Sequence, residues 1–336
     1  MTEKLVSILT PCYNGEKYID HYAEALLAQE YSNCQIIFMD DGSTDGTAAK
    51  ILSYETRFIE KGFSFSYHHH QNGGPAYAIA QGLQYVTGDY LTWPDVDDRL
   101  TPDSIRKKVT LLEEHPEYGI VRTDYKAVLE EEPDVEIGCG VRNLPDRFHE
   151  EVFEDCLKGN SVWYQPGCYM VRMDAFLRAN PDRYIYYPAH GQNIQMLLPV
   201  FYYYKCAFLP EALYVYVVHP DSRQRQAERT YESLVQSFAS ERDTMEATIR
   251  HMHVPQEERY IQMAKLRYSR MLFNVAYHAR RQQDARQYYR DYRNAGGRGL
   301  RYSLKSVFAG SELFHAAVDL RKRILRAVAA RSRNTK

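Results

Sequence analysis

The first hundred residues alternate between short apolar runs and amphipathic stretches, and this alternation restricts the fold more than any other feature of the chain. The predicted strands lie at residues 6–10, 35–39 and 90–93, where most residues are apolar or aromatic, and at residues 65–69. The stretches between them carry apolar residues at helical spacing and lie at residues 16–30, 44–54 and 76–86. Strands that alternate with helices predict a mostly parallel sheet with helices on both faces. We therefore expect an α/β domain.

A polar, turn-forming cluster follows each of the four predicted strands. The clusters are residues 11–14, 40–43, 72–75 and 95–98. In an open α/β sheet the ligand binds beyond the carboxyl ends of the strands, so the four clusters are expected to converge on one cleft. A connecting loop would explain any one cluster, whereas a nucleotide with a metal ion explains all four together. No glycine-rich phosphate-binding motif follows the first predicted strand, so a metal would neutralise the phosphates.

The cluster at residues 95–98 is the most acidic of the four. Asp95, Asp97 and Asp98 repel one another unless a cation or a set of donors shares their charge. Carboxylate oxygens are the ligands that Mg²⁺ and Mn²⁺ prefer, usually together with substrate phosphates. A solvated acidic loop is the alternative for such a cluster taken alone.

Composition limits the class of protein. A chain of 336 residues has room for one large or two moderate domains, and its net charge of −2 does not suggest a nucleic-acid partner. The six cysteines are scattered without a C-x-x-C pair, and no signal peptide precedes Leu5, so we expect a reduced, cytoplasmic setting. No uninterrupted apolar run reaches the roughly 20 residues that a membrane-spanning helix needs.

The motifs PCYN, MDDGSTDGT, NGGPAYA and GDYLTWPDVDD follow one another in this order. The series resembles the nucleotide-binding half of the inverting family 2 glycosyltransferases, which have the Rossmann-like GT-A fold. The resemblance covers the first third of the chain and continues more loosely to about Arg225. It implies a glycosyltransferase domain at residues 1–225, with a nucleotide-sugar half at 1–100 and an acceptor half at 101–225. Residues 226–336 show a helical pattern and form the predicted C-terminal region.

The resemblance also implies roles for individual residues. The implied nucleotide-binding residues in the first two clusters are Pro11, Tyr13, Asn14 and Asp41. Asp41 would accept a hydrogen bond from a uracil imide, and Asp95 would face the ribose. Asp97 would bind the Mn²⁺ or Mg²⁺ ion that bridges the diphosphate, while Asp98 would orient the loop.

The acceptor half departs from the family pattern at the expected general base. Members of the family usually carry a Glu-Asp pair at the start of a late helix, and this chain has Gln192 and Asn193 there. An amide cannot act as a general base, although Gln192 can position a hydroxyl. His190 has a suitable intrinsic pKa, but a structural role at the helix start is an equal alternative. Asp124, on a predicted strand, is the second candidate base.

Two segments further along complete the predicted site. After an apolar run at residues 213–218, the chain reads His219-Pro-Asp-Ser222-Arg223. In glycosyltransferases of the GT-A fold a histidine here can complete the metal shell, and a nearby arginine can offset the charge of the leaving group. His219 is therefore the second candidate metal ligand and Arg223 a candidate donor-binding residue. A solvated loop histidine remains the alternative.

The other predictions concern local structure. Thr101 is expected to cap a helix that ends before Pro116, and residues 130–140 are expected to form an acidic surface loop. The tail at residues 312–336 combines apolar positions at helical spacing with seven lysines and arginines. Such a basic amphipathic helix suits peripheral contact with an anionic membrane, and a packing helix with a solvated basic face is the alternative.

The combined features predict a metal-dependent inverting glycosyltransferase. It would transfer a hexosyl or N-acetylhexosaminyl group from a nucleotide sugar, a UDP-sugar in the preferred interpretation, to a glycan or lipid-linked acceptor in bacterial surface polysaccharide synthesis. Its place would be the cytoplasm, at the inner face of the membrane if the tail binds lipid. One alternative is a non-catalytic nucleotide-sugar-binding or scaffold protein, which the missing acidic pair suggests. A nucleotidyltransferase is a weaker alternative, because no basic triphosphate-binding loop is found.

Overall fold

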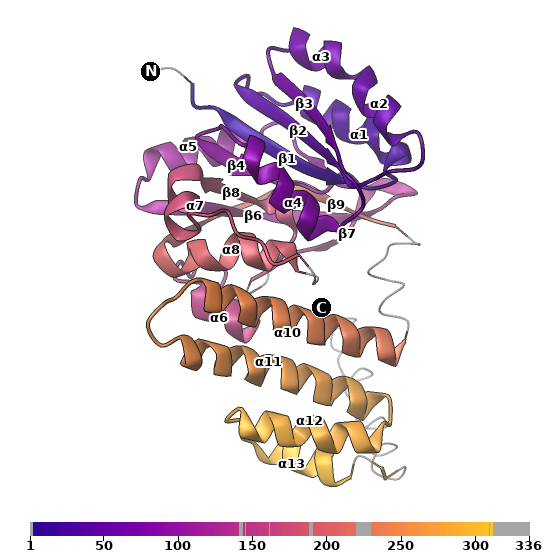
Figure 1. Cartoon of the computed structure of the whole chain (residues 1–336), viewed down its shortest axis with the longest axis vertical. Helices are drawn as coiled ribbons and strands as arrows, with labels where there is room; N and C mark the ends of the chain where they lie inside the picture. Colours follow the sequence, from indigo (N-terminus) through magenta and orange to yellow (C-terminus); the bar gives the residue numbers. More distant parts are fainter. Residues whose placement is uncertain are drawn as a thin grey trace, which may run out of the picture. The chain divides into compact units, whose positions relative to one another are not determined.

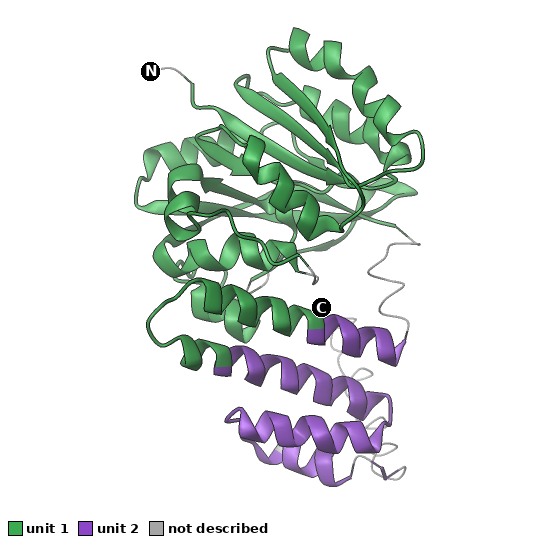
Figure 2. Ribbon diagram, in the orientation of Figure 1, with its two compact units in different colours: residues 1–226, 240–261 green, residues 227–239, 262–336 purple. Residues whose placement is uncertain are grey.

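A computed structural model describes residues 3–140, 144, 146–160, 162–187, 191–219, 230–308 and 310–311. The chain separates into two compact units (Figure 2). Unit 1 comprises Met1–Gln226 and Ser240–Ile261, and unit 2 comprises Ala227–Ala239 and Gln262–Lys336. Unit 1 holds the predicted α/β domain and unit 2 is helical.

Unit 1 is built on a mixed sheet (Figure 1). Its strands are β1 (Val6–Cys12), β2 (Cys34–Asp40), β3 (Ser64–His69), β4 (Tyr90–Thr92), β5 (Arg99–Leu100), β6 (Tyr118–Leu129), β7 (Glu132–Cys139), β8 (Tyr169–Arg172) and β9 (Lys205–Val218). Their order is β3-β2-β1-β4-β8-β6-β9-β5, and β7 pairs with β6 outside this path. The strands predicted in the first hundred residues are thus confirmed as β1 to β4.

Parallel pairing is confined to two parts of this sheet. Strands β3, β2, β1 and β4 run parallel, as the alternating pattern predicts, and β6 runs parallel to β9. Strand β8 is antiparallel to both β4 and β6, so it joins the two parallel parts. The carboxyl ends of β1, β2 and β4 therefore lie along one edge of the sheet.

Helices cover both faces of the sheet in unit 1 (Figure 1). They are α1 (Glu16–Leu27), α2 (Thr47–Ser53), α3 (Glu55–Glu60), α4 (Pro75–Gly82), α5 (Ser104–Glu114), α6 (Phe153–Lys158), α7 (Met173–Ala179) and α8 (Gln192–Tyr203), with short 3₁₀ turns at Leu83–Tyr85 and Pro166–Cys168. Helix α4 packs on β1 and β2. The connections through α1 (from β1 to β2) and α2 (from β2 to β3) run toward one end of the strand order, whereas the connection through α4 (from β3 to β4) runs in the opposite direction. Right-handed crossovers then place α4 on the other face.

Two local predictions are wrong. Helix α5 begins at Ser104, not directly after Thr101, because the Thr101 hydroxyl donates to the Asp103 carboxylate at 2.8 Å instead of capping a backbone amide. Most of the predicted loop at 130–140 is strand β7, antiparallel to β6. Most residues of β7 are exposed, so the strand lacks the apolar alternation that marks a half-buried strand.

Unit 2 combines the start of α10 (Tyr231–His251) and most of α11 (Glu257–His278) with α12 (Gln282–Asn294) and α13 (Leu300–Val307). Its core is formed by Phe273, Ala276, Tyr277 and Ala285, with tyrosines packed around them. The helical C-terminal region is therefore confirmed. The tail at residues 312–336 lies outside the described residues. Within the described part of the chain, no helix has the length and apolar character needed to cross a membrane.

Candidate functional site

The three carboxylates after β4 lie together. Asp95, Asp97 and Asp98 each offer an oxygen atom, and these atoms lie within 4.8 Å of one another. The side chain of Asp97 is 39% exposed, whereas Asp98 is buried. Asp95 is also partly exposed, so two carboxylates are accessible to solvent while the third lies in the interior.

Burial makes this acidic cluster electrostatically unfavourable. It raises the pKa of Asp95 to about 8, and the neighbouring charge of Asp97 adds to the effect. Burial also raises the pKa of Asp97, against the opposing influence of His219. A cation among the three groups would reverse these shifts, because it favours the ionised form of each carboxyl. The oxygen-rich donor set thus fits a hard divalent ion.

Asp98 anchors the loop to strand β9. Its Oδ2 atom accepts a hydrogen bond from the Tyr214 hydroxyl at 2.6 Å, and its Oδ1 atom accepts one from the backbone N–H of Val217 at 2.7 Å. Both hydrogen bonds lower the pKa of Asp98, but burial together with the charges of Asp97 and Asp95 raises it well above its usual value. Asp98 thus connects the acidic loop to β9 through two hydrogen bonds.

His219 lies beside the acidic cluster and contacts two carboxylates. Its Nε2 atom is 3.9 Å from Oδ2 of Asp97, and its Nδ1 atom is 2.8 Å from Oε2 of Glu130. The Tyr18 ring packs against the imidazole with a centroid distance of 4.6 Å. The contact with His219 lowers the pKa of Glu130. A histidine that binds a metal through one ring nitrogen is usually oriented by a carboxylate at the other ring nitrogen.

Glu130 was not predicted as a site residue, yet the sheet register explains its position. Strands β6 and β9 are parallel, and Leu129 pairs with Val218 at their carboxyl ends. The next residues, Glu130 and His219, must then emerge side by side. This position depends on the pairing of two strands that lie almost 90 residues apart in the chain. A single sequence does not reveal such a pairing, so no signal for Glu130 was available.

The clusters after β1, β2 and β3 are joined by hydrogen bonds. The backbone N–H of Asn14 donates to Oγ of Ser43 at 2.9 Å, and its Oδ1 atom accepts from the backbone N–H of Thr44 at 2.8 Å. The two oxygens of Asp41 accept from the backbone N–H groups of Gly73 and Gly74 at 2.7 and 2.8 Å. The structure therefore brings these three predicted clusters together.

The first cluster also lies next to the acidic loop. Pro11 pairs with Met39 in the sheet, and Tyr13 directly follows the end of β1. A Cβ atom placed on Gly15 would lie 3.3 Å from Val96, in the middle of the acidic loop. Residues predicted to bind the base and residues predicted to bind the metal are thus neighbours along one edge of the sheet.

On the acceptor side, Asn193 forms a bridge at the start of α8. Its Oδ1 atom accepts a hydrogen bond from Nε1 of Trp93 at 3.0 Å, and its Nδ2 atom donates to the carbonyl oxygen of Tyr164 at 2.8 Å. An indole N–H can only donate and a carbonyl can only accept, so the bridge needs a side chain with both functions. Trp93 lies two residues before Asp95, so this amide links α8 to the acidic loop.

The remaining predicted catalytic residues differ in their surroundings. Gln192 is the first residue of α8 and is partly exposed, and its side chain makes no hydrogen bond to another described residue. Asp124 lies in β6 with 2% of its surface exposed, and its Oδ1 atom accepts from the backbone N–H of Tyr125 at 2.9 Å. His190 and Arg223 lie outside the described residues.

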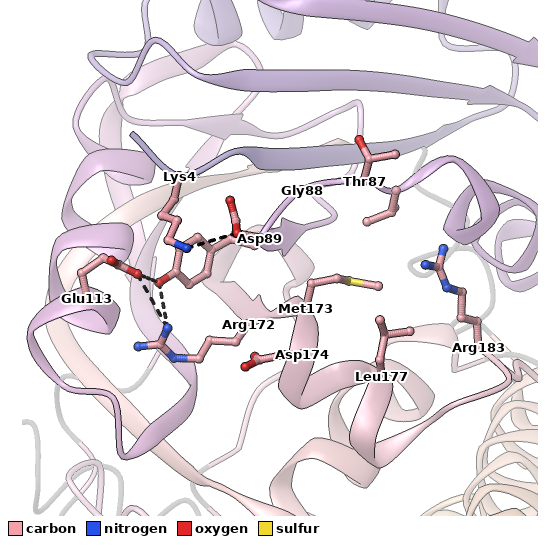
Figure 3. A pocket seen from close by; sticks show the side chains of 12 residues that line it. Lys4, Thr87, Gly88, Asp89, Glu113, Arg172, Met173, Asp174, Leu177 and Arg183 are labelled. Carbon is pink, nitrogen blue, oxygen red and sulfur yellow. Dashed lines mark hydrogen bonds and ion pairs between the residues drawn. The ribbon is translucent and has the colours of Figure 1, made fainter. Parts of the chain in front are cut away.

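A cavity of about 430 Å³ lies at the opposite edge of the sheet, next to the amino ends of β1 and β4 (Figure 3). Its lining contains Lys4 and Arg172, whose charges are matched by Asp89 at 3.3 Å and by Glu113 at 3.7 Å. Arg183 donates to a backbone carbonyl. These cations already have partners, so the cavity is a poor match for a diphosphate.

The chain matches one family model, described as Glycosyl transferase family 2, over residues 7–177. Among curated proteins it is 33% identical over 110 residues to the putative teichuronic acid biosynthesis glycosyltransferase TuaG of Bacillus subtilis. This match covers 33% of the chain and 42% of TuaG. The chain spans less than half the length of the curated relatives it matches.

Two solved structures are similar in fold. Residues 1–349 of TarS from S. aureus, in complex with UDP-GlcNAc, align with a TM-score of 0.60 and 17% identity, covering 87% of this chain and 81% of that one. The mannosyltransferase PcManGT from Pyrobaculum calidifontis, in complex with GDP-Man and Mn²⁺, aligns with a TM-score of 0.57 and 15% identity, covering 98% and 87%. At these identities the likeness concerns the fold alone.

Proposed function

The chain belongs to glycosyl transferase family 2, and we propose that it is a metal-dependent inverting enzyme that uses a nucleotide-sugar donor. The observation that carries this proposal is the group of three carboxylates at the carboxyl end of β4, whose oxygens lie within 4.8 Å of one another. Glycosyltransferase activity is the activity of the family, and its GT-A relatives are known with nucleotide sugars bound. The metal, the donor and the acceptor of this chain are our proposal.

Asp97 and His219 are the proposed protein ligands of a Mn²⁺ or Mg²⁺ ion. The side chain of Asp97 is 39% exposed, and the Nε2 atom of His219 lies 3.9 Å from its Oδ2 atom. Glu130 would orient His219, and Asp98 would hold the loop in place. A bound divalent cation would neutralise the charge that develops on the departing diphosphate.

The proposed donor is a UDP-sugar. Asp41 would face the uracil and Asp95 the ribose, with Pro11, Tyr13 and Asn14 forming the rest of the nucleoside site. The two oxygens of Asp41 already accept from Gly73 and Gly74 but retain further acceptor capacity. The structural relatives bind UDP-GlcNAc in one case and GDP-Man in the other, so fold alone does not fix the base.

The proposed acceptor is a glycan or lipid-linked glycan of a bacterial surface polysaccharide. Its support is the similarity to TuaG, whose name places that protein in teichuronic acid biosynthesis. Such an acceptor suits a cytoplasmic enzyme that contacts the inner face of the membrane. We keep the basic tail at residues 312–336 as the proposed contact.

The general base is proposed to be His190, directly before Gly191 and α8. Asn193 cannot take that role because it is an amide held by Trp93 and Tyr164. Asp124 remains the second candidate, although its burial and its hydrogen bond to Tyr125 favour a structural role in this conformation. Gln192 would position the acceptor hydroxyl, and Arg223 would offset charge on the leaving group.

A turnover assay tests this function against the alternatives. Purified protein would be incubated with Mn²⁺, a panel of UDP- and GDP-sugars and membrane-derived or synthetic acceptors, and release of nucleoside diphosphate would be followed. We expect one donor to be turned over, with inversion at the anomeric carbon visible by NMR. Binding of a nucleotide sugar without turnover on any acceptor would support the scaffold alternative. In a parallel reaction with UTP or GTP and a sugar 1-phosphate, release of pyrophosphate would support a nucleotidyltransferase.

The matched variants for this assay are Asp97→Asn and Glu258→Gln. The first removes one carboxylate charge from the acidic loop while keeping the side-chain size. The second removes a charge from a residue of α11 that is 78% exposed. Turnover that is lost only in Asp97→Asn would support the metal site.

A further inference from the structure

Helix α13 presents its apolar residues to solvent. Three large apolar side chains of α13 follow one another at helical spacing: Leu300 (75% exposed), Leu304 (43%) and Val307 (67%). Positions separated by three, four and seven residues lie on one side of a helix. They form a continuous outward stripe, which we call the α13 face.

The inner side of α13 is the more polar one. Tyr302 packs against Phe273 with ring centroids 5.8 Å apart, and Lys305 places its Nζ atom 4.7 Å from the centre of the Tyr277 ring. Lys305 and Ser306 are both buried. A surface helix normally turns its apolar stripe toward the core, so α13 has the reverse arrangement. An exposed apolar stripe of this kind is typical of a surface that binds a partner.

Charge in this part of the chain favours an anionic partner. Residues 298–336 contain ten lysines and arginines but only two acidic residues, a net charge of +8. Because the whole chain carries −2, residues 1–297 carry −10. An exposed apolar helix face in a basic segment of the sequence is the combination that binds the headgroup region of anionic bilayers.

We propose that the α13 face docks on an anionic lipid bilayer, with the helix lying in the plane of the membrane surface. Leu300 and Val307 are the most exposed of the three side chains and would enter the boundary between headgroups and acyl chains. Eight residues are too few to span a bilayer, so the contact is peripheral. This docking does not depend on the sugar donor or on the chemistry at Asp97.

Vesicle co-sedimentation tests the proposal with the full chain. We expect the wild type to bind vesicles of phosphatidylcholine with 30% phosphatidylglycerol at least fivefold more strongly than vesicles of phosphatidylcholine alone. The double variant Leu300→Ser/Val307→Ser should lose at least tenfold in binding to the anionic vesicles. The control Leu52→Ser/Ile59→Ser removes comparably exposed apolar side chains from α2 and α3 and should bind as the wild type does.

Several outcomes would overturn the proposal. One is that the wild type does not bind anionic vesicles; another is that the Leu300→Ser/Val307→Ser variant binds them fully. A dimer in light scattering that is lost in this variant would mean that a second copy of the chain covers the face. Nucleotide-sugar binding by the variant should equal that of the wild type, so failure of this proposal is distinguishable from failure of the proposed function.

A fluorescent label separates lipid from coverage by the chain itself. Five of the six native cysteines are buried, so Val307→Cys in a Cys139→Ser background can be labelled selectively with an environment-sensitive dye. We expect a blue shift of emission only when anionic vesicles are added. Emission that is already blue-shifted in the monomer without vesicles would contradict lipid docking, because another part of the chain would then cover the face.

Discussion

The proposed donor side and the proposed acceptor side of unit 1 use polar side chains in different ways. On the donor side, Asp41 and Asn14 bind backbone groups of the neighbouring clusters, so the loops hold one another in place. On the acceptor side, the side chain of Asn193 accepts a hydrogen bond from Trp93, which lies 100 residues earlier in the chain. Asn193 stands at the position where the family resemblance predicts a general base, and its side chain connects α8 to the acidic loop instead.

This difference indicates that the side chain at position 193 has a structural role in place of a catalytic one. A carboxylate at position 193 could accept from Trp93 but could not donate to the Tyr164 carbonyl. The surroundings of Asn193 are therefore complementary to an amide. In the proposed mechanism, proton transfer is then carried by another group, while the carboxylates of the proposed metal site are retained.

The substitution Asn193→Asp should have the largest effect on this connection. It places a carboxylate opposite the Tyr164 carbonyl, and an unsatisfied or repulsive buried contact costs about 1–3 kcal/mol. We expect the free energy of unfolding to fall by about that amount in urea denaturation, and turnover to fall with it. Gln192→Glu is the neighbouring control, with an expected change within about 0.5 kcal/mol because that side chain is partly exposed. Higher turnover in Asn193→Asp would show that the position still functions as a base.

The substitution Glu130→Gln probes how His219 is held. Loss of the residue that orients a metal-binding histidine typically weakens metal affinity by about 10- to 100-fold. We expect a change of this size in Mn²⁺ titrations followed by electron paramagnetic resonance, with the fold intact. Glu131→Gln, at an adjacent exposed residue, is the control. Unchanged Mn²⁺ affinity in Glu130→Gln would remove His219 from the proposed metal shell.

The acidic loop should also make metal binding depend on pH. The pKa of Asp95 in the folded protein is raised to about 8, so this group is protonated at pH 6. A cation bound beside it would favour its ionised form, so binding and loss of this proton are coupled. We expect Mn²⁺ affinity to rise by up to about tenfold per pH unit between pH 6 and 8. Affinity that is flat over this range would mean that Asp95 is already ionised without metal.

Without metal, the same shift predicts a loss of stability with rising pH. The raised pKa of Asp95 means that the folded state holds its proton more tightly than the unfolded chain does. This contribution to stability is fully present below about pH 4 and is lost as the pH rises through about 8. Saturating Mn²⁺ should diminish the loss in thermal unfolding.

The smallest expected effect comes from Trp93→Phe. It removes the indole N–H that donates to Asn193 and keeps an aromatic ring in the core, so the lost hydrogen bond should cost about 1 kcal/mol. In a double-mutant cycle with Asn193→Ala, the two changes should couple by about 0.5–1.5 kcal/mol in urea unfolding. Additive effects would show that the bridge does not connect the two sides energetically.

The donor side was predictable from the sequence because its signals are local. Each strand in the first hundred residues is followed directly by its own polar cluster, and a parallel sheet brings the ends of the strands to one edge. The strands that became β1 to β4 were expected within a few residues of their observed bounds. Asp95, Asp97 and Asp98 needed no long-range information, because they lie within four residues of one another.

The acceptor side was less predictable because its contacts join distant parts of the chain. Trp93 and Asn193 are separated by 100 residues, and Glu130 meets His219 only through the pairing of β6 with β9. Strand β7 was missed because most of its residues are exposed, so its pairing with β6 leaves no alternating pattern. Such features depend on register and tertiary packing, which periodicity does not encode.

The most direct test of the account is calorimetric titration of UDP-GlcNAc and other nucleotide sugars into the wild type and Asp97→Asn, each with and without Mn²⁺. The account predicts that one nucleotide sugar binds the wild type in a Mn²⁺-dependent manner and that Asp97→Asn loses the Mn²⁺-dependent part. Glu258→Gln should bind as the wild type does. Equal Mn²⁺-dependent binding by Asp97→Asn, or no binding of any nucleotide sugar to the wild type, would contradict the proposed metal and nucleotide site at the carboxyl ends of the strands.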